Sequence, residues 1–152
     1  MHPPCSDATG PLEVAAGLLR DGDLVLVCQR LATAVHPLRW EFPGGKVEAG
    51  ESPEACLQRE LLEELGVDAT IGVRLASVEH RYPSGPHVRV HFFDVVAHRG
   101  ALTNRVFERI DWRPIGRLSE LDFLDADRPL VELIRRRAML DLAARRSILE
   151  GR

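Results

Sequence analysis

The stretch that decides the fold is "WEFPGGKVEAGESPEACLQRELLEELGV", residues 40–67. It opens with two aromatic side chains, continues through a Pro-Gly-Gly turn and ends in a segment with clear helix signals. Ser52 is a typical N-cap residue, Pro53 suits the first helical position, and Gly66 suits the C-terminal stop. The stretch therefore predicts a glycine turn followed by a helix within residues 52–67.

Three carboxylates share one face of this predicted helix. At about 100° per residue, Glu63 falls near 300° and Glu64 near 40° from Glu60. The opposite arc is expected to pack on a sheet and contains Ala55, Leu61, Leu62 and Leu65. Like charges one turn apart repel, whereas a bound cation would reverse the sign of that interaction. From the helix alone, the acidic face is either solvated or a site for Mg²⁺ or Mn²⁺.

Outside this stretch the chain alternates strand and helix signals. Strands are expected within residues 12–29, with a turn at Asp21-Gly22, and at 74–82, 87–98 and 109–115. Pro129 opens a second helix that continues to Arg146. This order predicts an α/β sheet with helices on its faces. We expect a single domain over residues 1–152, with a loose N-terminal arm at 1–11 and a helical C-terminal extension at 138–152.

Composition excludes several classes of protein. The chain has 152 residues, enough for one domain, and its net charge of −3 gives no general reason to expect nucleic-acid binding. The arginines near the C-terminus either contact RNA or form a solvated helix face. The three cysteines fit a reducing compartment, and the chain shows neither a signal peptide nor a membrane span. These features predict a cytoplasmic protein without a membrane partner; they do not indicate an oligomeric state.

The spacing of the charged residues carries more information than their number. From Gly45 the chain reads G-x5-E-x7-R-E-L-x-E-E-x-G-V, and the defined positions are Gly45, Glu51, Arg59, Glu60, Leu61, Glu63, Glu64, Gly66 and Val67. This pattern matches every defined position of the Nudix box. The chain resembles the Nudix hydrolases from about Leu12 to Ile134, and "WEFPGGKVEAGE" and "ADRPL" are most similar to the MutT branch. The resemblance implies a Nudix α/β/α sandwich with a mixed β-sheet and the Nudix loop-helix.

The resemblance also implies a metal site and its reaction. The implied ligands of Mg²⁺, or Mn²⁺ as a substitute, are the Gly44 carbonyl, Glu60, Glu63 and Glu64. Arg59 and Glu51 would orient these carboxylates, and either Glu60 or Glu63 would act as general base. MutT-type enzymes cleave nucleoside triphosphates into a nucleoside monophosphate and pyrophosphate, so a small nucleotide is the expected partner.

Three further residues are expected to contact the nucleotide: Lys46 at the phosphates, together with Phe42 and Asp127. Asp127 stands where the MutT branch carries an Asn that reads oxidised guanine. An ionised Asp only accepts hydrogen bonds, so it would favour a base with an exocyclic amino group, such as cytosine. Asp127 alternatively caps the helix that begins near Pro129.

The chain departs from the family pattern at one position. Family members often supply another metal-binding Glu six residues before a Trp, here Trp112, and Val106 occupies that place. Glu108 stands two residues later. Either Glu108 binds the metal through a shifted loop or the helix carboxylates hold the metal alone.

Two rival functions remain open from the sequence. Pro83 lies about where some ADP-ribose and nucleotide-sugar pyrophosphatases carry a Pro after the box. A Nudix-fold module that senses nucleotides without cleaving them is the other rival, although such modules usually have a degraded box and this one is intact.

Overall fold

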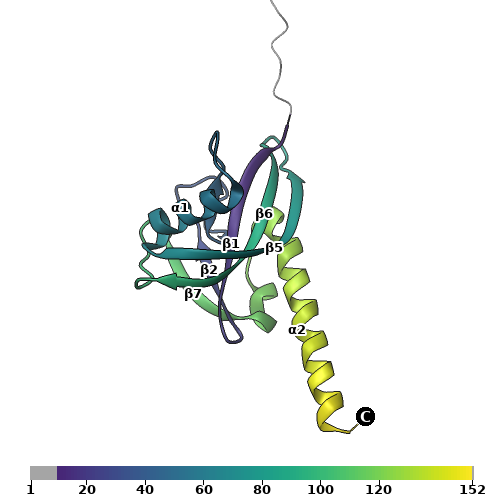
Figure 1. Cartoon of the computed structure of the whole chain (residues 1–152). Helices are drawn as coiled ribbons and strands as arrows, with labels where there is room; N and C mark the ends of the chain where they lie inside the picture. The colour runs from purple at the N-terminus through teal and green to yellow at the C-terminus, as the bar shows by residue number, and fades with distance from the viewer. Residues whose placement is uncertain (1–9, 152) are drawn as a thin grey trace, which may run out of the picture.

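The computed structural model describes residues 10–151 (Figure 1). Its elements in chain order are β1 (Leu12–Asp21), β2 (Leu24–Gln29), β3 (Trp40–Glu41), β4 (Gly44–Lys46), α1 (Pro53–Leu65), β5 (Asp68–Arg81), β6 (His87–Arg99), β7 (Arg109–Pro114), the 3-10 turns η1 (Ile115–Glu120) and η2 (Asp125–Asp127), and α2 (Arg128–Leu149). Most of the predicted N-terminal arm, residues 1–9, lies outside the described residues.

The strands form one mixed sheet. Its main order is β3-β2-β1-β6-β5, with β4 paired to β1 and β7 paired to β2. β1 and β6 run parallel, with Leu12 opposite Val88 and Leu19 opposite Val95, and every other pairing is antiparallel. The predicted mixed α/β sheet is therefore correct.

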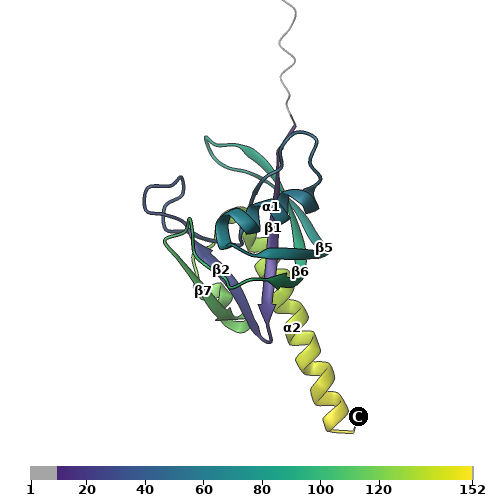
Figure 2. The same cartoon turned by 60° about the vertical axis from the view of Figure 1, so that its left-hand side comes forward.

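Helices cover both faces of this sheet. Alternation along β1 points Ala15 and Leu19 to one side, where they pack with buried leucines of α1. Ala16 and Leu18 point to the other side and pack with η1 and the first turns of α2. Figures 1 and 2 show α1 on one face, while α2 leaves the body from the other. This is the predicted three-layer sandwich.

Helix α1 begins and ends as its sequence predicts. The Ser52 hydroxyl accepts the N–H of Ala55 at 3.1 Å, and Gly66 adopts φ 70° at the C-terminal end. The packing face differs from the expected one, because Ala55 and Leu62 are exposed. The buried residues are Cys56, Leu57, Leu61 and Leu65. The β4 turn covers the side of the helix that carries Cys56, whose thiol lies 3.3 Å from the Lys46 carbonyl.

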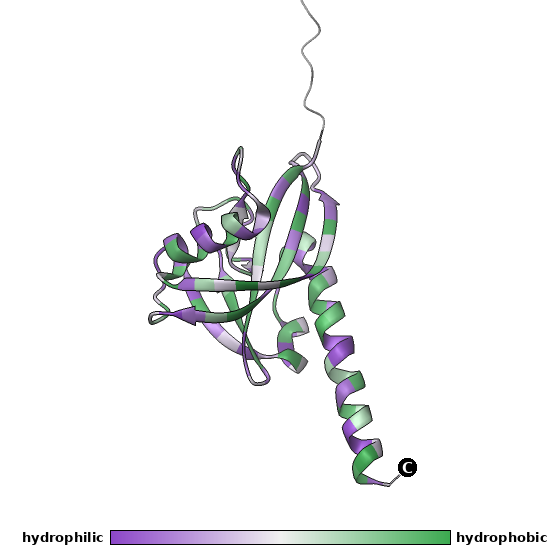
Figure 3. Cartoon of the chain, viewed as in Figure 1, coloured by the Kyte–Doolittle hydropathy of each residue, from purple (hydrophilic) through white to green (hydrophobic). Residues whose placement is uncertain are grey.

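Helix α2 extends well beyond the domain. Leu130 and Val131 are its only fully buried residues, and every residue from Met139 to Glu150 is exposed. The hydropathy colouring shows that apolar and polar bands alternate along this projecting part (Figure 3). Within residues 10–151 no helix is long and apolar enough to span a membrane.

Candidate active site

The glycine turn lies directly on the central strand of the sheet. Gly44 and Gly45 of β4 pair with Ala16 and Ala15 of β1, and the Gly17 N–H donates to the Pro43 carbonyl at 2.9 Å. A Cβ on Gly44 would stand 2.7 Å from the Ala16 Cα and would also meet the Ala15 carbonyl oxygen. Only glycine fits this close approach, which brings the turn against the carboxylates of α1.

Arg59 joins the turn to the helix. Its guanidinium makes a bidentate pair with Glu51, with Nε–Oε2 at 3.0 Å and Nη2–Oε1 at 2.8 Å. It also donates to Glu60 Oε1 at 2.9 Å and to the Lys46 carbonyl at 3.2 Å. The Arg59 hydrogen bonds hold the pKa of Glu51 down at about 2, so Glu51 stays ionised. Arg59 and Glu51 thus lie where they can fix the orientation of Glu60.

Glu60 and Glu64 form a close carboxyl pair one turn apart. Burial raises the pKa of Glu64 to about 9, assisted by the hydrogen bond and the negative charge of Glu60. Glu64 Oε2 is buried and has no hydrogen-bond partner among the described residues. A buried, unpaired carboxylate oxygen beside a second carboxylate fits a hard divalent cation.

The other predicted metal ligands are placed differently. Glu63 is 59% exposed and its carboxylate lies 3.5 Å from Arg59 Nη1. Within residues 10–151 no three Asp, Glu, His or Cys side chains stand close enough to hold a metal by themselves. Glu60 and Glu64 are thus the carboxylates that lie together, and the Gly44 N–H on the side of Glu64 lowers the pKa of Glu64.

Glu108 lies on the loop that runs past the C-terminal end of α1. The Arg105 N–H donates to the backbone carbonyl of Glu64 at 3.0 Å, and the Glu108 N–H donates to the backbone carbonyl of Gln29 at 2.9 Å. Val106 and Glu108 are both exposed. The Glu108 carboxylate forms no hydrogen bond or ion pair with the part of the chain that the structure describes. The loop is thus anchored beside the carboxyl pair, and the role of Glu108 stays a prediction.

At the other end of the site lies Asp127, which is 5% exposed. Asp127 occupies the N-cap position of α2, as the helix-cap alternative expected, but its side chain makes no capping bond there. Its Oδ2 instead accepts the Phe42 N–H at 3.0 Å. Burial, with a smaller contribution from the Glu41 charge, raises the pKa of Asp127 to about 8 against the opposing effects of the Phe42 N–H and Arg30. The Phe42 ring stacks on Phe123 with centroids 5.3 Å apart and lies in the core. Its backbone is therefore what contacts Asp127.

Sequence reasoning missed three residues between the carboxyl pair and Asp127. Cys28 on β2 lies opposite Glu41 on β3, and Arg30 Nη1 donates to Glu41 Oε2 at 2.9 Å. Burial raises the pKa of Cys28 well above its usual value, and the charges of Glu64, Glu41 and Asp127 raise it further. Those three acids therefore lie near Cys28. The two-residue period of β2, which puts Cys28 and Arg30 on one face, was the available signal.

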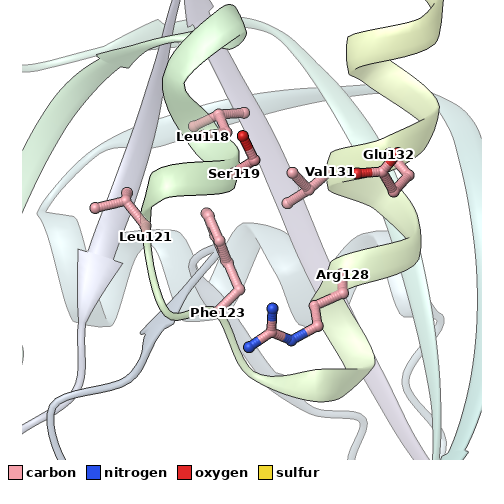
Figure 4. A pocket seen from close by; sticks show the side chains of 7 residues that line it. All are labelled: Leu118, Ser119, Leu121, Phe123, Arg128, Val131 and Glu132. Carbon is pink, nitrogen blue, oxygen red and sulfur yellow. The ribbon is translucent and has the colours of Figure 1, made fainter.

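Lys46 lies at the end of β4, and its carbonyl accepts the Arg59 guanidinium at 3.2 Å. Its side chain is exposed, and its ammonium makes no hydrogen bond or ion pair with the residues described here. A separate cavity of about 190 Å³ lies between η1 and α2 (Figure 4). No predicted site residue lines that cavity, so it is not part of the candidate active site.

The loop-helix and its carboxyl pair define the Nudix class of hydrolase. The NUDIX domain family matches residues 11–134, and the chain belongs to this family. The predicted family, fold and enzyme class are confirmed, and members of this class generally require a divalent metal.

Particular relatives are enzymes acting on nucleoside triphosphates. The CTP pyrophosphohydrolase of Escherichia coli (strain K12) is 36% identical over 121 residues, which are 80% of this chain and 89% of that protein. The 8-oxo-dGTP diphosphatase of Proteus vulgaris is 40% identical over 95 residues, 62% of this chain and 84% of that protein. The solution structure of the Escherichia coli ORF135 protein superposes with a TM-score of 0.72 at 35% identity, covering 89% of this chain and 92% of that one.

Proposed function

We propose that this protein cleaves nucleoside triphosphates to a nucleoside monophosphate and pyrophosphate with Mg²⁺, and that it prefers a base with an exocyclic amino group. The observation that carries the proposal is the row of acids from the Glu60–Glu64 pair to buried Asp127. One end suits a metal and phosphates, and the other end suits a base. The names of the two relatives described above support the same reaction class.

At the phosphate end each side chain has a separate task. Glu60 and Glu64 would hold the cation, which when bound neutralises phosphate charge and activates a water molecule. Arg59 keeps the Glu60 carboxylate in place through the 2.9 Å contact. Lys46 has a free ammonium for a phosphate oxygen. Glu60 and Glu63 remain the two candidate bases for the proton of the attacking water.

At the base end Asp127 supplies the selective contact. Its Oδ2 is occupied by the Phe42 N–H, and no hydrogen bond from the described residues reaches Oδ1. Oδ1 is therefore the atom available to a nucleotide. When ionised it accepts from an amino group and repels a carbonyl oxygen. A buried polar group left unpaired costs about 1–3 kcal/mol, which is a change in preference of one to two orders of magnitude.

A panel of nucleotides assayed with Mg²⁺ tests the proposal. The substrates are CTP, dCTP, dATP, dGTP, 8-oxo-dGTP and ADP-ribose, with products separated by chromatography. We expect the highest kcat/KM for the cytidine nucleotides, with pyrophosphate rather than phosphate as the second product. Faster turnover of ADP-ribose would overturn the substrate class. Binding without turnover in either Mg²⁺ or Mn²⁺ would establish a nucleotide-sensing module instead.

A further inference from the structure

Tyr82, which directly follows β5, contacts the η2 turn that carries Asp127. Its phenol oxygen accepts the Ala126 N–H at 3.2 Å, and Ala126 is the residue before Asp127. Tyr82 is 8% exposed and belongs to the core cluster on the η1–α2 side of the sheet, not to the cluster under α1. This hydrogen bond therefore reaches the base end of the site without involving the carboxyl pair of α1.

The Ala126 N–H depends on this bond. The η2 turn contains only three residues, and no side chain caps its start. The first N–H groups of a helical turn have no acceptor inside the turn. Among the described residues the Tyr82 oxygen is the acceptor for this N–H, and Ala126 is 3% exposed. Loss of the phenol oxygen would leave a buried N–H unpaired, so the turn would have to shift toward another acceptor.

Tyr82 is itself held firmly in place. Its N–H donates to the Pro86 carbonyl at 3.2 Å, and its carbonyl accepts the Gly85 N–H at 3.1 Å in the turn between β5 and β6. Two imidazoles pack against its ring, with the ring centroids of His36 at 4.8 Å and of His80 at 4.5 Å. The phenol oxygen is thus a fixed reference point for the backbone of η2.

Other contacts of the same segment restrain Asp127 less. Arg39 pairs with Asp122 at 3.0 Å and with Asp125 at 3.2 Å, but the two carboxylates are 64% and 43% exposed. Exposed ion pairs contribute little to stability. The Phe42 N–H fixes Oδ2 of Asp127 but not the backbone from which the side chain projects. The buried bond from Tyr82 is the contact that restrains this backbone from the β5 side.

We infer that Tyr82 is a positioning residue for base selection: its phenol oxygen fixes the η2 backbone and thereby the direction in which Oδ1 of Asp127 faces the nucleotide. The inference rests on the proposed function, in which Asp127 is the selective contact to the base. Loss of the phenol oxygen should therefore change which base is preferred while the chemistry at Glu60 and Glu64 continues unchanged.

Tyr82→Phe removes only the phenol oxygen, and it is tested on dCTP and 8-oxo-dGTP at pH 9. We expect kcat/KM for dCTP relative to 8-oxo-dGTP to fall about fivefold or more, through a higher KM for dCTP at an unchanged kcat. Ser77→Ala is the matched control, because it removes another β5 hydroxyl, which lies 3.0 Å from His91 Nδ1 on the opposite face of the sheet. It should leave the ratio at the wild-type value even where the melting temperature falls.

Two further measurements separate positioning from general destabilisation. Amide hydrogen exchange at Ala126 should be slow in the wild type and in Ser77→Ala, and much faster in Tyr82→Phe. Tyr82→Phe is also combined with Asp127→Ala, which removes the group that Tyr82 is inferred to position. In that background Tyr82→Phe should no longer change the substrate ratio.

The outcomes distinguish this inference from the proposed function. If Asp127→Ala changes the ratio and Tyr82→Phe does not, the role of Tyr82 is overturned and the role of Asp127 stands. An equal effect of Tyr82→Phe with and without Asp127→Ala would show that Tyr82 acts by another route, and fast exchange at Ala126 in the wild type would remove the hydrogen bond. If Asp127→Ala leaves the ratio unchanged, the base contact of the proposed function is wrong and the inference fails with it.

Discussion

Base preference should change with pH, because Asp127 titrates near the pH of the assay. Burial raises the pKa of this carboxyl to about 8; the charge of Glu41 adds to that rise, while Arg30 and the Phe42 N–H oppose it. Below this pH the carboxyl keeps its proton and, like an amide, can both donate and accept. Above it the ionised carboxylate only accepts. The preference of the enzyme for an amino-bearing base such as cytosine over 8-oxoguanine should therefore increase as the pH rises through about 8.

The magnitude follows from the ionised fraction. With a pKa of about 8, roughly 10% of Asp127 is ionised at pH 7 and roughly 90% at pH 9. If only the ionised form accepts the amino group of dCTP, kcat/KM for dCTP relative to 8-oxo-dGTP should rise at least about tenfold over these two units, because repulsion of the 8-oxo carbonyl by the carboxylate adds to the change. The ratio of the two substrates is measured because titration at the carboxyl pair, including Glu64, affects both equally.

The assay compares wild type with Asp127→Asn between pH 6.5 and 9.5 on both nucleotides. The amide does not titrate, so its ratio should stay flat and should favour 8-oxo-dGTP relative to wild type. Any titration of the nucleotides themselves affects both proteins and is removed by the comparison. The reasoning about Asp127 is refuted by a wild-type ratio that is independent of pH, or by one that changes equally in Asp127→Asn.

Three substitutions and one control substitution test the metal end. Glu64→Gln should fold with an unchanged or higher melting temperature, because Gln resembles the protonated acid. It should nevertheless lose about 100-fold or more in kcat/KM across Mg²⁺ concentrations. Near-normal turnover would exclude a ligand role for Glu64. Gly45→Ala places a Cβ against the carboxylate of Glu60. This change should lower kcat about tenfold with little change in melting temperature. Full activity would show that the Glu60 carboxylate can move freely. Glu108→Ala should weaken the dependence on Mg²⁺ more than Val106→Ala does, and equal activity of the two variants would remove Glu108 from the site.

The local elements could be predicted because their signals lie within short segments. Ser52 and Gly66 mark the ends of α1, and the turn at Gly22 separates β1 from β2 as expected. β5 begins at Asp68, six residues before the predicted start at Arg74. Its early part contains bulges between Thr70 and Ala76, which break the alternation that marks a strand in sequence.

Contacts between distant segments could not be predicted in the same way. The Asp127 carboxylate accepts a hydrogen bond from the Phe42 N–H, 85 positions away in the sequence. No local sequence pattern distinguishes an Asp in this role from an Asp that caps a helix. The Arg30–Glu41 pair depends on how β2 and β3 align, which the long connection between them leaves open. Phe42 belongs to the segment that is similar to the MutT branch, and this position indicated that it lies near the nucleotide. It did not indicate that the Phe42 ring is buried in the core.

The packing face of α1 is the part that a helical wheel alone misplaced. The wheel puts Glu64 at about 40°, between Cys56 at about 320° and Leu57 at about 60°, and both of these neighbours are fully buried. An acid in such a position is costly unless a proton or a cation neutralises it. The packing face expected from the sequence was built from the apolar residues alone and placed Glu64 on the opposite, metal-binding face. Its Oε2 is buried and, among the described residues, unpaired, as expected of an acid that a proton or a divalent cation neutralises.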